Sequence, residues 1–250
     1  MLSDPSRAVA APAPGRHSGP AAPEAPAHRL ELERRLVFHR RAAVIRAELV
    51  HQGGYVRFVK PVLDRLIAFV VLLLIAPFVL LLALIARVKL GRGVIFKQDR
   101  VGQGAATFRI FKFRSMLHDR RTQQLPFVGP DRRVTHKSAD DPRHTPFGRT
   151  LRKWSLDEIP QLWNVLRGEM SLVGPRPELV DVVERYGLWD HPRHLVKPGL
   201  TGVWQISEHR SELLHQSMWV DFDYLERITF WGDLKVVLRT PLAVLRSRGA

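Results

Sequence analysis

The chain has 250 residues, a formal net charge of +15, a pI of about 11.1 and no cysteine. This length allows one domain of ordinary size with additional segments. The charge favours anionic partners, namely nucleic acid, an acidic membrane surface or phosphorylated small molecules. The lack of cysteine excludes a disulfide framework and thiolate chemistry.

The first 54 residues divide into two segments of different composition. Residues 1–27 are rich in alanine and proline and carry too few large apolar side chains for a core, which predicts a disordered leader. Residues 28–54 combine many arginines with apolar residues at roughly helical spacing. This pattern fits a basic amphipathic helix on a membrane surface, and it fits a solvated charged helix or linker equally well.

Residues 55–90 carry the strongest membrane signal. Residues 66–86 form a run of 21 residues without a charge, and a helix of that length covers roughly 31 Å, about the thickness of the hydrocarbon core of a bilayer. The alternative is a buried helix of a soluble domain, but such a helix normally keeps a polar face. Basic residues flank the run on both sides, at 57, 60 and 65 and at 87, 89 and 92.

A proline near the middle of this run decides the expected topology. Segments rich in Lys and Arg stay on the cytoplasmic side, so a simple span would place one of the two basic flanks on the wrong side. Pro77 removes a helical hydrogen bond and kinks or breaks the helix. We therefore expect a re-entrant membrane helix over residues 55–90 that bends at Ala76 and Pro77 and leaves both ends in the cytoplasm.

Residues 91–240 are expected to form a cytoplasmic domain. The pieces VIFKQDRVG and TFRIFKFRSM are β-prone and are separated by glycine, which predicts a β-hairpin. Residues 117–145 are polar and predict a long loop, whereas residues 148–168 predict helix. The expected fold is α+β and mainly helical, with a re-entrant membrane helix hairpin, a small β-hairpin, interfacial helices and a basic tail at 241–250.

The residues best suited to chemistry are two adjacent carboxylates, Asp157 and Glu158, within a dense segment at 148–178. Ser155 and Glu158 have the spacing of a capping box, which would start a helix at Ser155. Pro160 favours a start closer to itself, because proline is tolerated only in the first turn. In either case a helix N-terminus near the pair would attract phosphate and favour ionised carboxylates.

Carboxylates beside a phosphate site can act as magnesium ligands, as general bases or as nucleophiles that form an acyl phosphate. The alternative is that Asp157 and Glu158 are only acidic residues placed favourably at a helix start. The following VGPRPE segment has a similar ambiguity. It is either a rigid turn or a device in which two prolines hold Arg176 ready for bidentate phosphate contact.

Taken together, the motifs resemble the bacterial sugar transferase family, the monotopic polyprenyl-phosphate phosphoglycosyl transferases. The resemblance covers residues 55–240, and several long motifs in the same order are more specific than one short motif. The matching pieces are the proline-broken apolar run, VIFKQDRVG, FRIFKFRSM, DDPRHTPFGRTLRKWSLDEIPQLWNVLRGEMSLVGPRPE and KPGLTGVWQ.

The resemblance implies an enzyme that transfers a sugar 1-phosphate from a UDP-sugar to polyprenyl (undecaprenyl) phosphate, releases UMP and requires Mg²⁺. By this match Asp157 is the nucleophile that forms a covalent phosphosugar intermediate and lies close to the metal, and Glu158 assists with protonation. The basic residues expected to contact substrate phosphate, unless they are structural, are Arg176, Arg149, Arg152, Lys112 and Arg114. Many relatives carry Ser-Pro at the membrane break where this chain has Ala76 and Pro77, so here the break depends on proline alone.

The C-terminal motifs KPGLTGVWQIS and DFDYLERITFWGDLKVVLRT are similar to those of the longer hexose-1-phosphate members that begin exopolysaccharide, capsule or O-antigen synthesis. This implies a UDP-hexose with glucose or galactose, a polyprenyl phosphate acceptor and a place at the cytoplasmic face of the inner membrane. The assembly, monomer or homodimer, is left open. A basic module that binds nucleic acid is disfavoured because its motifs are missing, and a scaffold with an unused dyad is disfavoured because the dyad is intact.

Overall fold

The computed structural model describes residues 38–47, 49, 54–116, 145–211, 217 and 219–246. The chain divides into two units, 1–40 and 41–250, and the described residues of the first, 38–40, are helical. In the second unit the helix continues to residue 47. The predicted leader, most of the predicted basic segment and nearly all of the predicted loop at 117–145 lie outside the described residues.

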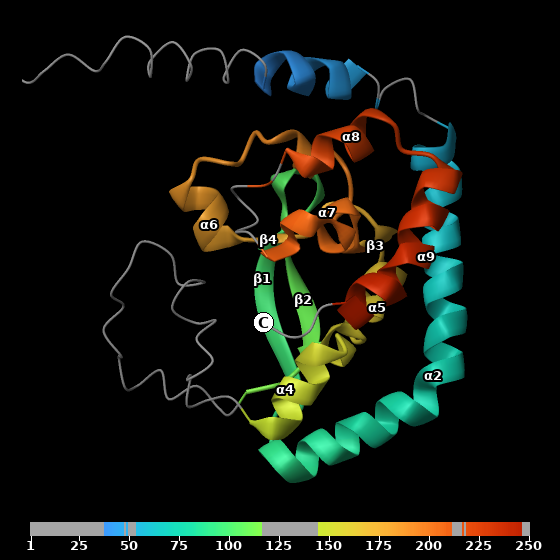
Figure 1. The fold of residues 1–250 in the computed structure, drawn as a ribbon, viewed down its shortest axis with the longest axis vertical. Helices are drawn as coiled ribbons and strands as arrows, with labels where there is room; N and C mark the ends of the chain where they lie inside the picture. The colour runs from blue at the N-terminus through green and yellow to red at the C-terminus, as the bar shows by residue number, and fades with distance from the viewer. Residues whose placement is uncertain are drawn as a thin grey trace, which may run out of the picture. The chain divides into compact units, whose positions relative to one another are not determined.

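The long apolar segment folds as one helix that bends. A π-helical turn, Tyr55–Val59, leads into α2, Lys60–Leu90. In the described part of the chain this is the one helix long and apolar enough to cross a membrane. It contains Pro77 and bends near its middle (Figure 1), so that it has two arms in an uninterrupted helix. The expected kink is therefore present, but the two arms do not fold back on each other as a hairpin in this structure.

Two small sheets form the β part of the domain. Strands β1, Ile95–Val101, and β2, Thr107–Phe113, pair antiparallel from Ile95 with Phe113 to Val101 with Thr107, as predicted. A short strand β4, Glu178–Leu179, continues this sheet on the other side of β1. A second sheet pairs β3, Ser171–Val173, in parallel with β5, Gly199–Thr201.

Short helices make up most of the remaining described structure, so the mainly helical α+β class is confirmed. The segment predicted to be helical contains α4, Pro146–Lys153, a 3₁₀ turn at Leu156–Glu158, and α5, Gln161–Arg167. Further along lie α6, Val180–Arg185, α7, Val203–Ile206, α8, Val220–Glu226, and α9, Phe230–Arg246. Three 3₁₀ turns lie at Gln103–Ala105, at Pro192–Leu195, which is η4, and at Glu208–Ser211. Helix α9 therefore contains the beginning of the segment predicted as a basic tail.

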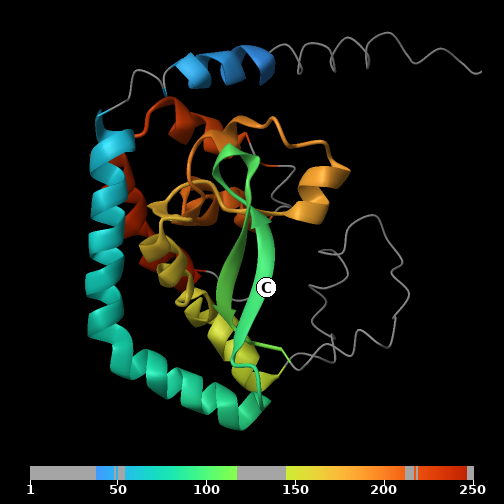
Figure 2. The ribbon, with the colours of Figure 1, turned by 180° about the vertical axis from the view of Figure 1, so that it is seen from behind.

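Two apolar clusters attach α2 to the domain, one on each arm. The first-arm cluster joins Ala68 of α2 to Ile110 of β2 and to Leu162 and Val165 of α5. The second-arm cluster joins Leu82 of α2 to Phe113 of β2 and Leu151 of α4. Helix α5 thus lies between the β-hairpin and the first arm (Figures 1 and 2).

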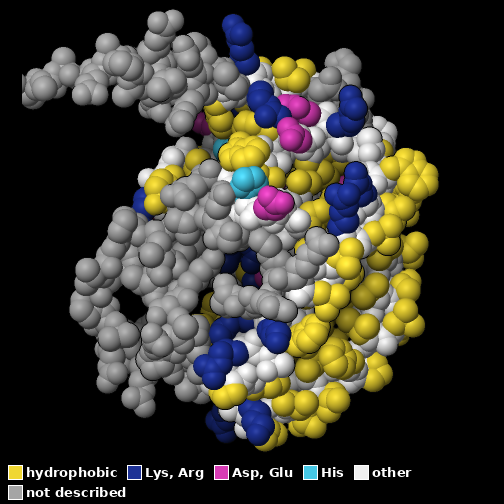
Figure 3. Space-filling model, in the orientation of Figure 1, with side chains coloured by type: hydrophobic (Ala, Val, Ile, Leu, Met, Phe, Trp, Pro, Cys, Tyr) yellow, Lys and Arg dark blue, Asp and Glu magenta, His cyan; other side chains and the backbone are white. Residues whose placement is uncertain are grey.

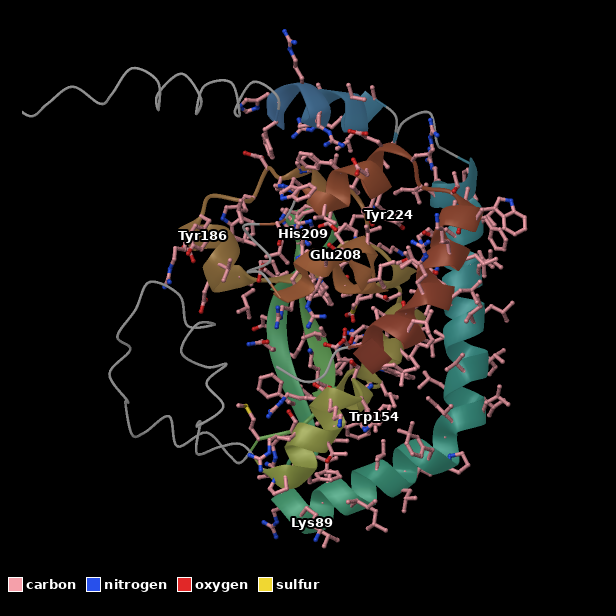
Figure 4. The ribbon with its side chains drawn as sticks, in the orientation of Figure 1. Lys89, Trp154, Tyr186, Glu208, His209 and Tyr224 are labelled. Atoms are coloured by element: carbon pink, nitrogen blue, oxygen red, sulfur yellow. The ribbon has the colours of Figure 1, made fainter. Side chains whose placement is uncertain are left out.

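A buried polar cluster fixes the beginning of α2 to α9. The ammonium Nζ of Lys60 lies 2.6 Å from Oδ2 of Asp233 in α9. Two hydroxyls donate to the same carboxylate, Tyr55 to Oδ2 and Tyr224 of α8 to Oδ1, each at 2.9 Å; Figure 4 labels Tyr224 beside α9. Ser171 of β3 donates to Asp64 at 2.5 Å. We call these residues the anchor cluster. Separating the first arm from α9 would break these contacts and leave buried charges unpaired, so the cluster holds the two helices together.

The outer faces of α2 and α9 are apolar and exposed. Along α2, Leu73, Leu74 and Leu80 are 65%, 74% and 70% exposed. Along α9, Trp231 and Leu238 are 74% and 66% exposed, with Leu242 and Leu245 following at helical spacing on the same face. Figure 3 shows hydrophobic side chains gathered along the side of the molecule where α2 and α9 lie. An apolar surface of this extent is typical of a protein that contacts lipid or a partner.

Candidate active site

The acidic pair lies in a tight turn between α4 and α5. Ser155 adopts the left-handed conformation, with φ of 53°, and does not cap a helix with its side chain. Leu156–Glu158 then forms a 3₁₀ turn, and α5 begins at Gln161 after Pro160. The capping box is therefore not formed, and the alternative of a helix start close to Pro160 is correct. The turn lies against β2, where Glu158 contacts Lys112, and its Leu156 packs on the second-arm cluster.

Two cations hold Glu158. The ammonium of Lys112 donates to Oε1 of Glu158 at 2.6 Å, and the guanidinium of Arg176 donates to the same oxygen at 3.0 Å. All three side chains are largely buried. Burial alone would raise the pKa of Glu158, but the positive charges of Arg176 and Lys112 outweigh it and hold the pKa well below its usual range. Glu158 is therefore ionised at neutral pH.

Asp157 has the opposite electrostatic character. Its side chain is buried, and that burial raises the pKa of Asp157 to about 6, a rise that Lys112 and Arg176 oppose and the charge of Glu158 reinforces. Adjacent carboxylates with pKa values pushed apart by their surroundings commonly have different roles in a site. Among the described residues, Glu158 pairs with two cations, whereas the structure shows no ion pair for the carboxylate of Asp157.

Lys112 reaches the dyad because β2 is fixed against α5. The side chain of Asn164, fully buried in α5, accepts from the backbone N–H of Phe111 at 3.1 Å and donates to the carbonyl of Arg109 at 2.8 Å. These bonds are made by the residues one and three positions before Lys112 in the strand. The sequence analysis did not single out Asn164. The sequence signal that could have found it is a side-chain amide within a mostly apolar helical segment, because a buried amide is expected to have hydrogen-bond partners.

Arg176 is held by the backbone on either side of it. Arg193 donates to the carbonyl of Arg176 at 2.7 Å, and its guanidinium pairs with Asp221 at 3.0 Å, with both charged groups buried. Arg100 donates to the carbonyl of Pro177 at 3.1 Å. Sequence analysis missed Arg193 and Asp221 because they come from separate elements, η4 and α8, and no local pattern connects them.

Glycines of the KPGLTG motif bring a second support to the Pro-Arg-Pro segment. Gly199 donates to the carbonyl of Pro175 at 2.9 Å, and Gly174 donates to Thr201 at 2.9 Å. A Cβ at Gly199 would collide with the backbone of Gly174. The motif therefore allows two backbones to approach closely enough for β5 to fix the loop that carries Arg176.

The other predicted basic residues do not gather around the dyad in the same way. Arg149 is exposed on α4. Arg152 donates to the hydroxyl of Ser115 at 3.3 Å. Arg114 is buried and donates to the carbonyls of Leu90 and Arg92 at the end of α2. This contact gives Arg114 a structural function, since cationic donors satisfy the free carbonyls at a helix C-terminus.

The described residues contain no cluster of three or more His, Asp or Glu side chains that could hold a metal by themselves. Asp157 nevertheless offers the ligand type that Mg²⁺ prefers, because this ion is commonly bound by one or two carboxylates together with substrate phosphates. The site thus fits a metal that arrives with a diphosphate substrate. It does not fit a dedicated protein cage of acidic ligands.

A buried carboxylate beside an ionised one held by two cations, in a domain packed against a bent apolar helix, is an arrangement suited to phosphoryl transfer. The comparison with protein families agrees with this class: residues 55–247 match the model of the bacterial sugar transferases. The chain belongs to the bacterial sugar transferase family, and the resemblance inferred from the motifs is confirmed.

Curated relatives cover most of the chain. The exopolysaccharide production protein ExoY of Sinorhizobium fredii is 38% identical over 193 residues, which are 75% of this chain and 85% of that protein. A UDP-glucose:undecaprenyl-phosphate glucose-1-phosphate transferase of Caulobacter vibrioides is 40% identical over 199 residues, 76% of this chain and 71% of that protein. An undecaprenyl-phosphate galactose phosphotransferase of Salmonella typhimurium is 36% identical over 201 residues, 78% of this chain and 42% of that protein.

Proposed function

We propose that this enzyme transfers a hexose 1-phosphate, of glucose or galactose, from a UDP-hexose to undecaprenyl phosphate as the first membrane step of exopolysaccharide or capsule synthesis. Family membership and the named activities of the relatives support the reaction class. The observation that carries the proposal is the buried Asp157 next to a Glu158 held by Lys112 and Arg176.

The reaction takes place in two displacements. A carboxylate oxygen of Asp157 attacks the phosphorus that carries the sugar, the bond to the bridging oxygen breaks, and UMP leaves with the bonding electrons. A phosphate oxygen of the lipid then attacks the same phosphorus and displaces Asp157 as a carboxylate. The products are polyprenyl diphosphate sugar and UMP.

The geometry supports a positioning function for Glu158 more than a proton-transfer function. A carboxylate with a pKa well below its usual range is a weak proton acceptor at neutral pH. It holds Lys112 and Arg176 beside Asp157, where their charges can stabilise the phosphate oxygens in both steps. The remaining predicted contacts, Arg149 and Arg152, would meet outer parts of the substrate.

Asp157 would hold Mg²⁺ together with the phosphates of the substrate. When bound, the ion neutralises phosphate charge and so favours attack by an anionic nucleophile. Lys112 and Arg176 supply the protein's own positive charge at the same place, and Asp157 supplies the oxygen ligand.

The attachment of both arms of α2 to one domain supports the re-entrant arrangement. The first arm is fixed by Ala68 and by Lys60 with Asp233, and the second by Leu82 and by the bonds of Arg114 to the last turn. A helix that crossed the bilayer would leave one of these contacts on the far side, within the membrane or beyond it. With both ends on the cytoplasmic face, the exposed sides of α2 and α9 contact lipid together.

Cysteine labelling tests this topology in the otherwise cysteine-free chain. Arg57→Cys and Arg92→Cys are treated in intact cells with a membrane-impermeant maleimide, and opened cells serve as the labelling control. Neither position should react from outside. Labelling of either one in intact cells would show that the helix spans the membrane.

Release of UMP tests the activity. Membranes containing the enzyme are incubated with Mg²⁺, undecaprenyl phosphate and one UDP-sugar at a time, and UMP is measured. UDP-glucose or UDP-galactose should give lipid-dependent UMP, and Asp157→Asn should abolish it. Failure with every UDP-sugar would refute the proposal and favour a scaffold function, whereas full activity of Asp157→Asn would refute the nucleophile.

A further inference from the structure

Ile159 directly follows the acidic pair and contacts both apolar clusters that fix α2. In the first-arm cluster it packs with a set that includes Ala68, Leu72 and Ile75. In the second-arm cluster it packs with a set that includes Leu82. Because Pro77 separates these two parts of α2, Ile159 lies where the bend faces the domain.

The turn that carries the dyad is short and hydrogen-bonded, so it moves as a unit. The backbone N–H of Glu158 donates to Ser155 at 3.1 Å, and that of Ile159 donates to Leu156 at 3.3 Å. Leu156 and Ile159, at the two ends of this turn, pack on the clusters of α2. Asp157 and Glu158, between them, face Lys112 and Arg176. A shift of Ile159 against α2 therefore shifts Asp157 as well.

We propose that Ile159 is a positioning residue that links the bend of α2 to the depth of Asp157 at the membrane, and that it is required chiefly for the lipid half of the reaction. The inference rests on the two-step function proposed above. A nucleotide sugar arrives from water and can follow a displaced Asp157. The phosphate of a long polyprenyl chain is held near the headgroups, so it cannot follow.

The size of the effect follows from the sensitivity of positioned reactions to distance. A misplacement of 1 Å can cost about 100-fold in rate, and removal of part of a half-buried side chain moves a turn by less than that. We expect Ile159→Ala to lower the rate of UMP release with undecaprenyl phosphate about tenfold more than the rate of UMP exchange without lipid. Ile159→Val, which removes a single methyl group, should give a smaller change in the same direction.

Two assays on the full-length protein in nanodiscs separate the half-reactions. Exchange of labelled UMP into UDP-hexose without lipid reports the first, and UMP release with undecaprenyl phosphate reports the complete cycle. Val183→Ala is the matched control, because Val183 is fully buried in α6 and belongs to neither cluster of α2. It should change both rates by the same factor. A water-soluble short-chain prenyl phosphate should restore the ratio of Ile159→Ala to that of the wild type.

The outcomes distinguish a failure of this inference from a failure of the proposed function on which it rests. A wild-type enzyme that exchanges UMP, with an Ile159→Ala variant whose two rates fall equally or not at all, would overturn the positioning role alone. A wild-type enzyme that neither exchanges nor releases UMP would overturn the proposed function and this inference with it. If Ile159→Ala does not fold, the same ratio measured for Ile159→Val decides, because an unchanged ratio there also overturns the inference.

Discussion

The pH dependence of the first half-reaction offers a direct test of the nucleophile. Attack requires ionised Asp157, and burial raises the pKa of this group to about 6. The sign follows: ionisation is nearly complete above the pKa and is lost as the pH falls through it. About nine in ten molecules are then ionised at pH 7 and about one in ten at pH 5, whereas an ordinary aspartate with a pKa of about 3.9 would change little over this range.

Replacing Lys112 by methionine should shift this pH dependence in a known direction. The ammonium of Lys112 lowers the pKa of Asp157. Its removal should therefore move the acidic limb of the pH–rate profile, where the rate falls with falling pH, to higher pH. We expect a movement of about one pH unit, which corresponds to about 1.4 kcal/mol of lost interaction with the carboxylate. Mg²⁺ beside Asp157 should have the opposite effect and move the limb to lower pH as its concentration increases.

The measurement is UMP exchange at low UDP-hexose and limiting Mg²⁺, conditions in which the profile reports the free enzyme. The wild-type rate should fall about tenfold between pH 7 and pH 5. Arg109→Met is the matched control, because Arg109 lies in the same strand but its side chain is 61% exposed and pairs with Asp99. A rate that stays flat to pH 5, or a limb that moves to lower pH in Lys112→Met, would refute the reasoning.

Two further predictions concern the supports of the site. Asp233→Leu leaves the buried ammonium of Lys60 without its nearest partner and should lower the unfolding free energy in detergent by about 3–5 kcal/mol. Adding Lys60→Met should restore most of this loss. A double variant no more stable than Asp233→Leu alone would contradict the prediction. Asp221→Asn removes the charge that holds Arg193 against the backbone of Arg176, so kcat/KM for UDP-hexose should fall about tenfold. The exposed Asp181→Asn should have no such effect, and equal losses in the two variants would show that the pair does not position Arg176.

Local sequence pattern predicted the elements whose structure depends on near neighbours. Alternating apolar residues on either side of a glycine-containing turn gave β1 and β2, and the uncharged run gave α2 with its bend. The acidic pair was singled out because two carboxylates and a Pro-Arg-Pro unit stand in one dense segment. In each case the physical cause, namely periodicity, proline geometry or residue chemistry, is contained within a short stretch of chain.

Contacts between distant segments could not be predicted in the same way. The capping box at Ser155 did not form because Pro160 directs the start of α5 and the chain before it turns through a left-handed residue. Arg114 was predicted to contact phosphate unless it is structural, and its bonds to the carbonyls of Leu90 and Arg92 could not be foreseen because only folding brings the end of β2 to the last turn of α2. Arg193 and Asp221 were missed because only the folded domain brings η4 and α8 together.

In the proposed reaction, the arrangement of the turn at 156–159 lets one site serve a soluble and a lipid-bound substrate. Its outer residues, Leu156 and Ile159, are apolar and pack on the clusters that contain α2, while its inner residues, Asp157 and Glu158, are charged and contact the cations of β2 and the Pro-Arg-Pro loop. The same four residues therefore tie the proposed nucleophile to α2 and to the cations Lys112 and Arg176. A dyad on a loop away from α2 could keep its chemistry with the nucleotide sugar, but its distance from a phosphate at the headgroups would be free to vary.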